Sequence, residues 1–175
     1  MHITQNIEAI ESEVGRLSPV QKILLGTDGS VTQLLEAITG AAEAVGTRVQ
    51  EIVPADGPTA DRLGIRVGEP VNYRVVELRN VSSGEVLIHA ISHTPVDRLS
   101  QEFRDDLMKA DIPIGKIIKQ HRIEARREIL NARVSAAPDD VGKLFSLCRN
   151  EPLLSRQYWI IHRGKPLIFI EKQLS

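Results

Sequence analysis

The sequence predicts an α+β protein, a six-stranded antiparallel β-sheet with helices packed on one face. Three observations predict this fold. Segments that alternate with a period of two come in pairs around short turns, as in β-hairpins. Segments with helical spacing precede and separate those pairs, and the regular strand–helix alternation of a parallel sheet is missing. With 175 residues, 42% of them hydrophobic, we expect one domain spanning residues 1–175.

The first forty residues predict three helices. Apolar side chains recur at helical spacing over residues 7–17, and a short second helix covers residues 18–25, with a proline in its first turn. In the third segment, residues 30–40, Ser30 and Gln33 fit a capping box, and a terminal glycine ends the helix.

The middle of the chain combines strand and helix patterns. A period of two over residues 43–54 predicts a strand, and the stretches VNYRVVELRN and EVLIHAIS predict a hairpin around Ser82-Ser83-Gly84. Residues 121–130 are ambiguous, because their composition favours a helix while their apolar alternation favours a strand. Further helices are predicted over residues 99–109, after Pro113, and over residues 138–148.

A second hairpin closes the sequence. Apolar runs at residues 158–161 and 167–170 flank Arg163-Gly164, which is typical of a tight turn. If the turn centres on this pair and the register is regular, Arg156 lies opposite Glu171. The hairpin would then carry an ion pair at its open end.

Composition excludes several functional classes. A formal net charge of −1 argues against a dedicated nucleic-acid binder. The basic stretch from Lys116 to Arg133 contains glutamates and lacks aromatic residues, so a solvated strand face or an anionic small-ligand pocket explains it better. No apolar run is long enough to cross a membrane, and we expect no signal peptide, because no basic segment followed by an apolar one opens the sequence. We therefore expect a cytoplasmic protein that binds neither nucleic acid nor a membrane.

Signatures of metal and cofactor sites are missing. The single cysteine, Cys148, excludes an internal disulfide and a cysteine-based metal cluster. His89 and His93 are four residues apart, but on a predicted strand this spacing does not make the helical pair of zinc enzymes. There is neither a Gly-rich nucleotide fingerprint nor a P-loop. We expect no metal and no cofactor.

Charged residues within apolar strands are the main functional signal. Arg74 shares a strand face with Val76, and Glu171 follows the apolar stretch PLIFI. Such residues are rarely buried without a partner, so they either form structural ion pairs or line a pocket whose ligand is the partner. Arginine suits a carboxylate ligand. The helix start around Ser30 and Thr32 is either a simple capped end or an anion-binding element.

Four motifs, in this order, resemble the chorismate pyruvate-lyase family: LLGTDGSVTQLLEAITG, YRVVEL with GEVLIHAISHTP, IPIGKII, and SRQYWIIHRGKPLIFIEKQL. The resemblance covers residues 24–174 and is greatest to a branch common in archaea, cyanobacteria and other bacteria. It implies a ligand cavity under helical flaps of the predicted sheet. It also implies a lyase that converts chorismate into 4-hydroxybenzoate and pyruvate without metal or organic cofactor, with a retained aromatic product.

The resemblance implies roles for particular residues. The family's carboxylate-binding arginine falls on Arg74 and the acidic residue of its last strand on Glu171, so both are expected to be catalytic. Glu171 would lie near the ether oxygen as an acid or hydrogen-bond partner. The expected substrate-binding residues are Val31, Ile114, Arg156, Ser30 and Thr32. The better-known bacterial enzymes have methionine and leucine at the positions of Val31 and Ile114.

Two alternatives stay open. The same fold serves as the effector-binding domain of winged-helix transcription regulators, which bind small molecules, such as aromatic carboxylates, without chemistry. The roughly forty residues before the sheet lack the pattern of a winged-helix module with a basic recognition helix. The other alternative is a lyase or hydrolase that acts on a relative of chorismate.

Overall fold

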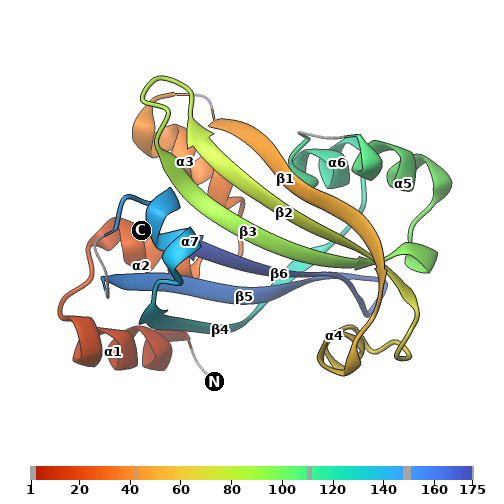
Figure 1. Ribbon diagram of the computed structural model, residues 1–175, viewed down its shortest axis with the longest axis horizontal. Helices are drawn as coiled ribbons and strands as arrows, with labels where there is room; N and C mark the ends of the chain where they lie inside the picture. The colour runs from red at the N-terminus through yellow and green to blue at the C-terminus, as the bar shows by residue number, and fades with distance from the viewer. Residues whose placement is uncertain (1–2, 42, 110–111, 148–150, 175) are drawn as a thin grey trace.

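The computed structural model describes residues 3–41, 43–109, 112–147 and 151–174. These residues form one six-stranded sheet and the helices that pack on it (Figure 1). The strands are β1 (Glu43–Pro54), β2 (Pro70–Asn80), β3 (Val86–Pro95), β4 (Arg126–Ala136), β5 (Pro152–His162) and β6 (Lys165–Leu174). They lie in the order β1-β2-β3-β6-β5-β4, and all neighbours are antiparallel. The predicted α+β fold is confirmed.

Each of the six predicted helices is present. They are α1 (Ile3–Val14), α2 (Pro19–Gly26), α3 (Val31–Thr39), α5 (Gln101–Met108), α6 (Ile114–Gln120) and α7 (Asp139–Leu144). The last is shorter than predicted, and Cys148 lies outside the described residues. The ambiguous stretch 121–130 divides into a turn and the first half of β4.

One helix, α4 (Gly57–Leu63), was not predicted. Asp56 caps its start by accepting a hydrogen bond from the Thr59 N–H, and Gly64 ends it with a left-handed backbone, φ 59°. Gly57 and Pro58 in its first turn made this segment resemble a loop, although proline is well tolerated at such a position.

The helix caps follow the sequence closely. The reciprocal capping box forms at α2, between Ser18 and Gln21. At α3 only the first half of the predicted capping box is described, in which Ser30 Oγ accepts a hydrogen bond from the Gln33 N–H at 3.4 Å. Gly40 ends this helix with φ 67°, a conformation that favours glycine. Local sequence signals therefore mark both ends of α3.

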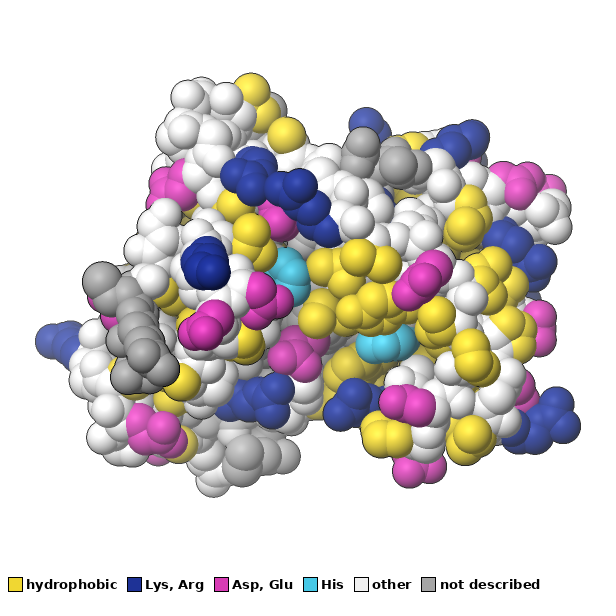
Figure 2. Space-filling view, in the orientation of Figure 1, with side chains coloured by type: hydrophobic (Ala, Val, Ile, Leu, Met, Phe, Trp, Pro, Cys, Tyr) yellow, Lys and Arg dark blue, Asp and Glu magenta, His cyan; other side chains and the backbone are white. Residues whose placement is uncertain are grey.

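Helices cover mainly one face of the sheet, which we call the helical face and which carries Arg74, Val76, Tyr158 and Ile170. Helices α1, α2 and α3 pack over one half of this face, and α5 and α6 over the other half. The opposite face, here called the open face, has only α4 and α7 at its two ends. Figure 2 looks onto the open face and shows hydrophobic side chains gathered over its middle.

The last hairpin forms around the predicted turn. His162 pairs with Lys165, so Arg163 and Gly164 make a two-residue connection. Their φ angles are 50° and 74°. Two consecutive positive φ angles are the mark of a type I′ turn, whose twist matches that of the flanking strands.

The predicted register of this hairpin is wrong beyond the first two pairs. Ile161 pairs with Pro166, but Ile160 pairs with Ile168, so Leu167 is an extra residue in β6. A bulge of this kind is not visible in an apolar run, because any of its residues could occupy it. It shifts all later pairs by one residue, which moves each following side chain to the other face.

The bulge separates the two residues of the predicted ion pair. Arg156 pairs with Lys172, and Glu171 pairs with Gln157. Arg156 and Lys172 belong to the helical face, whereas Glu171 belongs to the open face. The expected Arg156–Glu171 contact is therefore absent, and each residue has different neighbours.

Stability should decrease between pH 7 and pH 5 because of His93. Burial lowers the pKa of this histidine, and Arg62 lowers it further while Asp56 opposes the shift. The unfolded chain takes up a proton near pH 6.5, and the folded protein does so only at lower pH. We expect the melting temperature to fall over this range in the wild type and to fall less in His93→Phe. Equal slopes for the two proteins would contradict this assignment.

Candidate functional site

The predicted site residues of three separate segments meet in one pocket. Its floor is the helical face of β2, β3, β5 and β6, and the starts of α3 and α6 cover it. Ser30, Val31, Thr32, Arg74 and Ile114 all line this pocket, which we call the Arg74 pocket. Its volume is about 60 Å³, room for only a few water molecules.

Arg74 is the central polar group of the pocket floor. It lies on β2, where its neighbours across the sheet are Gln50 on β1 and Ser92 on β3. Its side chain is 1% exposed, and Nη2 donates a hydrogen bond to Thr47 Oγ1 at 3.1 Å. The hydrogen bond to Thr47 on β1 orients the guanidinium within the pocket floor.

Arg127 lies beside the two covering segments. It projects from β4 into the pocket wall, and its Nη1 donates to the backbone oxygen of Asp28, just before α3, at 3.3 Å. A methyl group built at Gly115, in the first turn of α6, would lie 3.8 Å from Arg127 Nη2. One half-buried guanidinium thus lies beside both flaps.

Lys172 gives the pocket a third cation. It lines the wall on β6, next to Tyr158, with its Nζ 5.9 Å from the centre of the Tyr158 ring. The bulge at Leu167 puts it there, since a regular register would have turned this position to the open face. Lys172 was not among the predicted site residues.

Arg156 lies next to this site but does not line it. It is 0% exposed, and its Nη1 and Nη2 donate to the backbone oxygens of Leu24 and Thr27 at 2.6 and 2.7 Å. Its Cζ lies 4.8 Å from the centre of the Tyr158 ring. Burial lowers the pKa of Arg156 from its ordinary value. The geometry makes this residue a clamp between β5 and the end of α2.

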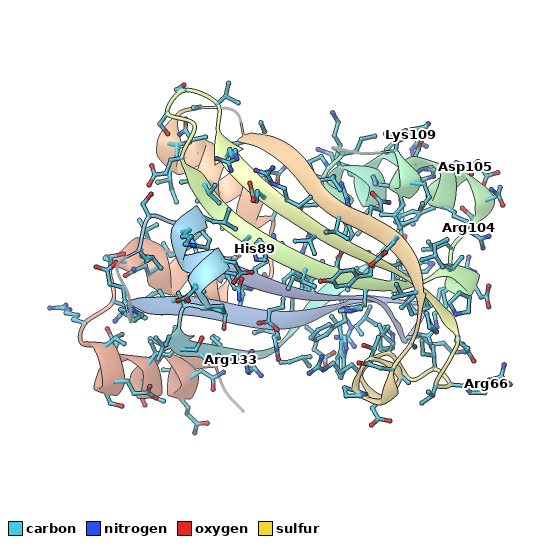
Figure 3. The ribbon with its side chains drawn as sticks, in the orientation of Figure 1. Arg66, His89, Arg104, Asp105, Lys109 and Arg133 are labelled. Carbon is cyan, nitrogen blue, oxygen red and sulfur yellow. The ribbon has the colours of Figure 1, made fainter. Side chains whose placement is uncertain are left out.

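Glu171 lies outside the Arg74 pocket. On the open face its Oε1 pairs with Arg133 Nη2 at 3.2 Å, and its Oε2 accepts a hydrogen bond from Gln157 Nε2 at 2.6 Å. Its side chain is 20% exposed. Figure 3 shows Arg133 beneath His89 on this same face. The sequence predicted Glu171 opposite Arg156, and the family resemblance implied a place near the ether oxygen of the substrate. The bulge at Leu167 is the reason that Glu171 lies on the open face instead.

The pocket is strongly cationic. Arg74, Arg127 and Lys172 line it, and no Asp or Glu side chain does so among the residues that the structure describes. Its remaining walls are mainly aliphatic, with Ser92 as a small polar group. Such a site suits an anion with an apolar body, since each charge of the ligand gains a guanidinium or ammonium partner. Within the described ranges, no group of His, Cys, Asp or Glu is arranged to hold a metal ion.

Sequence reasoning missed Arg127 and Lys172 for different reasons. Arg127 lies in the basic stretch from Lys116 to Arg133, for which an anionic small-ligand pocket was one of two explanations. The stretch therefore indicated a possible anion site, but it did not indicate which of its residues would line that site. No sequence feature indicated Lys172, because the face of β6 on which it lies depends on the bulge.

The described helices include none long and apolar enough to cross a membrane.

This sheet with a cationic pocket under two helix starts defines an α+β domain of the chorismate lyase-like class. The family model described as Chorismate pyruvate-lyase Rv2949c-like matches residues 25–175, and the chain belongs to that family.

Two relatives illustrate the range of the family. A Methanocaldococcus jannaschii protein named "Putative lyase MJ0807" is 37% identical over 157 residues, which cover 86% of this chain and 74% of that protein. A chorismate pyruvate-lyase from Mycobacterium leprae is 24% identical over 156 residues, which cover 89% of this chain and 74% of that protein. The resemblance stated from the sequence is confirmed.

Solved structures with low sequence identity share the fold. PhnF from Mycobacterium smegmatis has a TM-score of 0.71 at 16% identity, over 86% of this chain and 64% of PhnF. The C-terminal domain of Yurk from Bacillus subtilis has a TM-score of 0.61 at 20% identity, over 74% of this chain and 87% of that domain. At these identities the similarity concerns the fold alone.

Proposed function

We propose that the protein is a chorismate lyase, which eliminates pyruvate from chorismate to give 4-hydroxybenzoate in the Arg74 pocket. The observation that carries this proposal is the set of three cations, Arg74, Arg127 and Lys172, around an aliphatic wall without a lining carboxylate in the described residues. Chorismate is a dianion with a carbocyclic ring, and both of its carboxylates need a cationic partner. Membership of the family supports the same reaction.

The substrate orientation follows from the position of the cations. Arg74, oriented on the floor by its hydrogen bond to Thr47, binds the ring carboxylate, and the N–H of Ile114 at the start of α6 adds a donor. The enolpyruvyl carboxylate lies toward Lys172 and Arg127. The buried charge of Arg156, behind the Tyr158 ring, adds a favourable field for both carboxylates.

The chemistry breaks the ring C3–O bond and removes the hydrogen at C4. Because no Asp or Glu lines the pocket among the described residues, the acceptor assigned to that hydrogen is the methylene carbon of the enolpyruvyl group itself, which closes a six-membered arrangement with C4, C3 and the ether oxygen. The methylene becomes the methyl group of pyruvate, the ether oxygen becomes its ketone oxygen, and the ring becomes aromatic. The Lys172 ammonium stabilises the negative charge that develops on the ether oxygen.

Entry of the substrate requires the flaps to separate. Pockets that enclose small organic ligands usually measure several hundred Å³, whereas the Arg74 pocket measures about 60 Å³. The starts of α3 and α6 are the covering segments, and Arg127 lies beside both. Closure of these segments over the substrate excludes water during the elimination.

The purified protein should release pyruvate and 4-hydroxybenzoate in equal amounts from chorismate. Pyruvate is measured with lactate dehydrogenase, and the phenol by its ultraviolet absorbance. Chorismate deuterated at C4 should give pyruvate labelled in its methyl group.

Arg74→Met should lower kcat/KM roughly a hundredfold, since a charged hydrogen bond to a carboxylate is lost. Arg66→Met, at an exposed position (Figure 3), is the matched control and should leave the rate unchanged.

The rival function is ligand binding without chemistry. If chorismate gives no product under any condition while 4-hydroxybenzoate binds with micromolar affinity, the protein is a binding module and the lyase proposal is wrong. A third result, in which a different enol ether releases pyruvate and chorismate does not, identifies a lyase for a chorismate relative.

A further inference from the structure

We propose that the protein has a second anion-binding site, at the opposite end of α6 from the Arg74 pocket. The segment after α6, the start of α5 and the β5–β6 turn enclose an open hollow of about 700 Å³, here called the outer hollow. None of the residues that line the Arg74 pocket lines this hollow. Helix α6 separates the two, since its first residue, Ile114, lines one, and His121, directly after its end, lines the other. Figure 1 shows α5 and α6 together at this end of the sheet.

The wall of the outer hollow is basic. Arg98, Arg122, Arg163 and Lys165 line it, and Glu124 is the one carboxylate among the described lining residues. The described structure gives no ion pair for the side chains of Arg122, Arg163 and Lys165. Like charges placed together without acidic partners repel one another, so an anion bound among them relieves an unfavourable interaction.

Two of these arginines also have a left-handed backbone conformation. Arg122 and Arg163 both have φ 50°, in the left-handed region that glycine and asparagine adopt more readily. A turn needs only such a backbone, and glycine would satisfy it with less strain. The chain instead places an arginine side chain at each position, on either side of the same hollow.

Other residues hold the frame of the hollow rigid. Arg98 donates to the backbone oxygens of Leu63 and Gly64 at 2.8 Å and also to that of Pro166, which fixes the base of the β5–β6 turn. His162 Nδ1 contacts the backbone oxygen of Glu124 at 2.8 Å. A carbonyl only accepts hydrogen bonds, so Nδ1 carries the proton.

The lining also has an apolar part. Leu99, Phe103, Ile123 and Leu167 line the hollow beneath the charged rim. This combination suits an organic anion with at least two negative charges on an apolar body, such as a phosphate monoester or a dicarboxylate. Inorganic phosphate carries the charge without the body and should bind more weakly.

The test is a titration of the ¹⁵N-labelled full chain with phenyl phosphate, followed by amide chemical shifts. We expect the largest shifts at residues 98–103, 121–124 and 162–167. The double variant Arg122→Gln/Arg163→Gln should bind at least tenfold more weakly, since each charge-assisted contact to a phosphate contributes about that much. Inorganic phosphate should bind at least fivefold more weakly than phenyl phosphate.

A matched control and two outcomes decide the proposal. Arg66→Gln removes an exposed arginine outside the outer hollow and should not change the affinity. The proposal is overturned if phenyl phosphate shifts only residues 30–32, 113–115 and 172, or if the double variant binds as tightly as the wild type. Because no step uses chorismate, the result does not depend on the proposed lyase activity.

Discussion

Lys172→Met should lower kcat for pyruvate release roughly a hundredfold, whereas Glu171→Gln should leave it within about twofold. The two residues are neighbours in sequence but project from opposite faces of β6. Lys172 lines the Arg74 pocket, where its ammonium meets the charge that develops on the ether oxygen; loss of one such donor typically costs a hundredfold or more. Glu171 pairs with Arg133 at 3.2 Å on the open face. The measurement is steady-state pyruvate release from chorismate by each variant.

This pair of variants distinguishes two registers of one hairpin. A regular hairpin without the bulge at Leu167 would turn Glu171 toward Arg74 and Lys172 away from it. In that case Glu171→Gln would abolish activity and Lys172→Met would be nearly silent, which would contradict the structure and restore the assignment made from the family resemblance. Both variants should melt within a few degrees of the wild type, so a loss of activity cannot be attributed to unfolding.

Arg156→Met should destabilise the protein by about 2 kcal/mol. The backbone oxygens of Leu24 and Thr27 lose their charged donors, and an unsatisfied buried carbonyl costs about 1–3 kcal/mol. Removal of a buried charge offsets part of this loss, because Arg156 is 0% exposed. For a chain of this size the melting temperature should fall by about 4–8 °C. Thermal unfolding followed by circular dichroism measures this shift.

The control for Arg156 is an arginine of the neighbouring strand. Arg133 belongs to β4 and the open face, and its side chain is 53% exposed. Arg133→Met removes a surface ion pair and a long hydrogen bond to Ser155, so the melting temperature should change by no more than about 2 °C. If Arg156→Met were as stable as Arg133→Met, the clamp between β5 and the end of α2 would make no net contribution to folding.

Local sequence signals predicted the elements that depend on local physics. The caps at Ser30 and Gly40, the turn at Arg163-Gly164 and the strand formed by VNYRVVELRN each depend on a few residues, and all were found where predicted. Helix α4 is the exception, because Gly57 and Pro58 suit a loop and a helix start equally well. The pocket residues that lie in these locally determined elements, such as Arg74 on β2 and Val31 at the start of α3, were among the predicted site residues.

By itself, the sequence determined the fold class, the family resemblance and a pocket around Arg74 under the starts of two helices. Only the tertiary structure showed which face of β6 meets that pocket. Lys172 lines the pocket, and Glu171 lies on the opposite face. The physical reason is the two-residue period of a strand. One extra residue at Leu167 leaves the apolar pattern of PLIFI almost unchanged, yet it exchanges the two faces for every residue that follows.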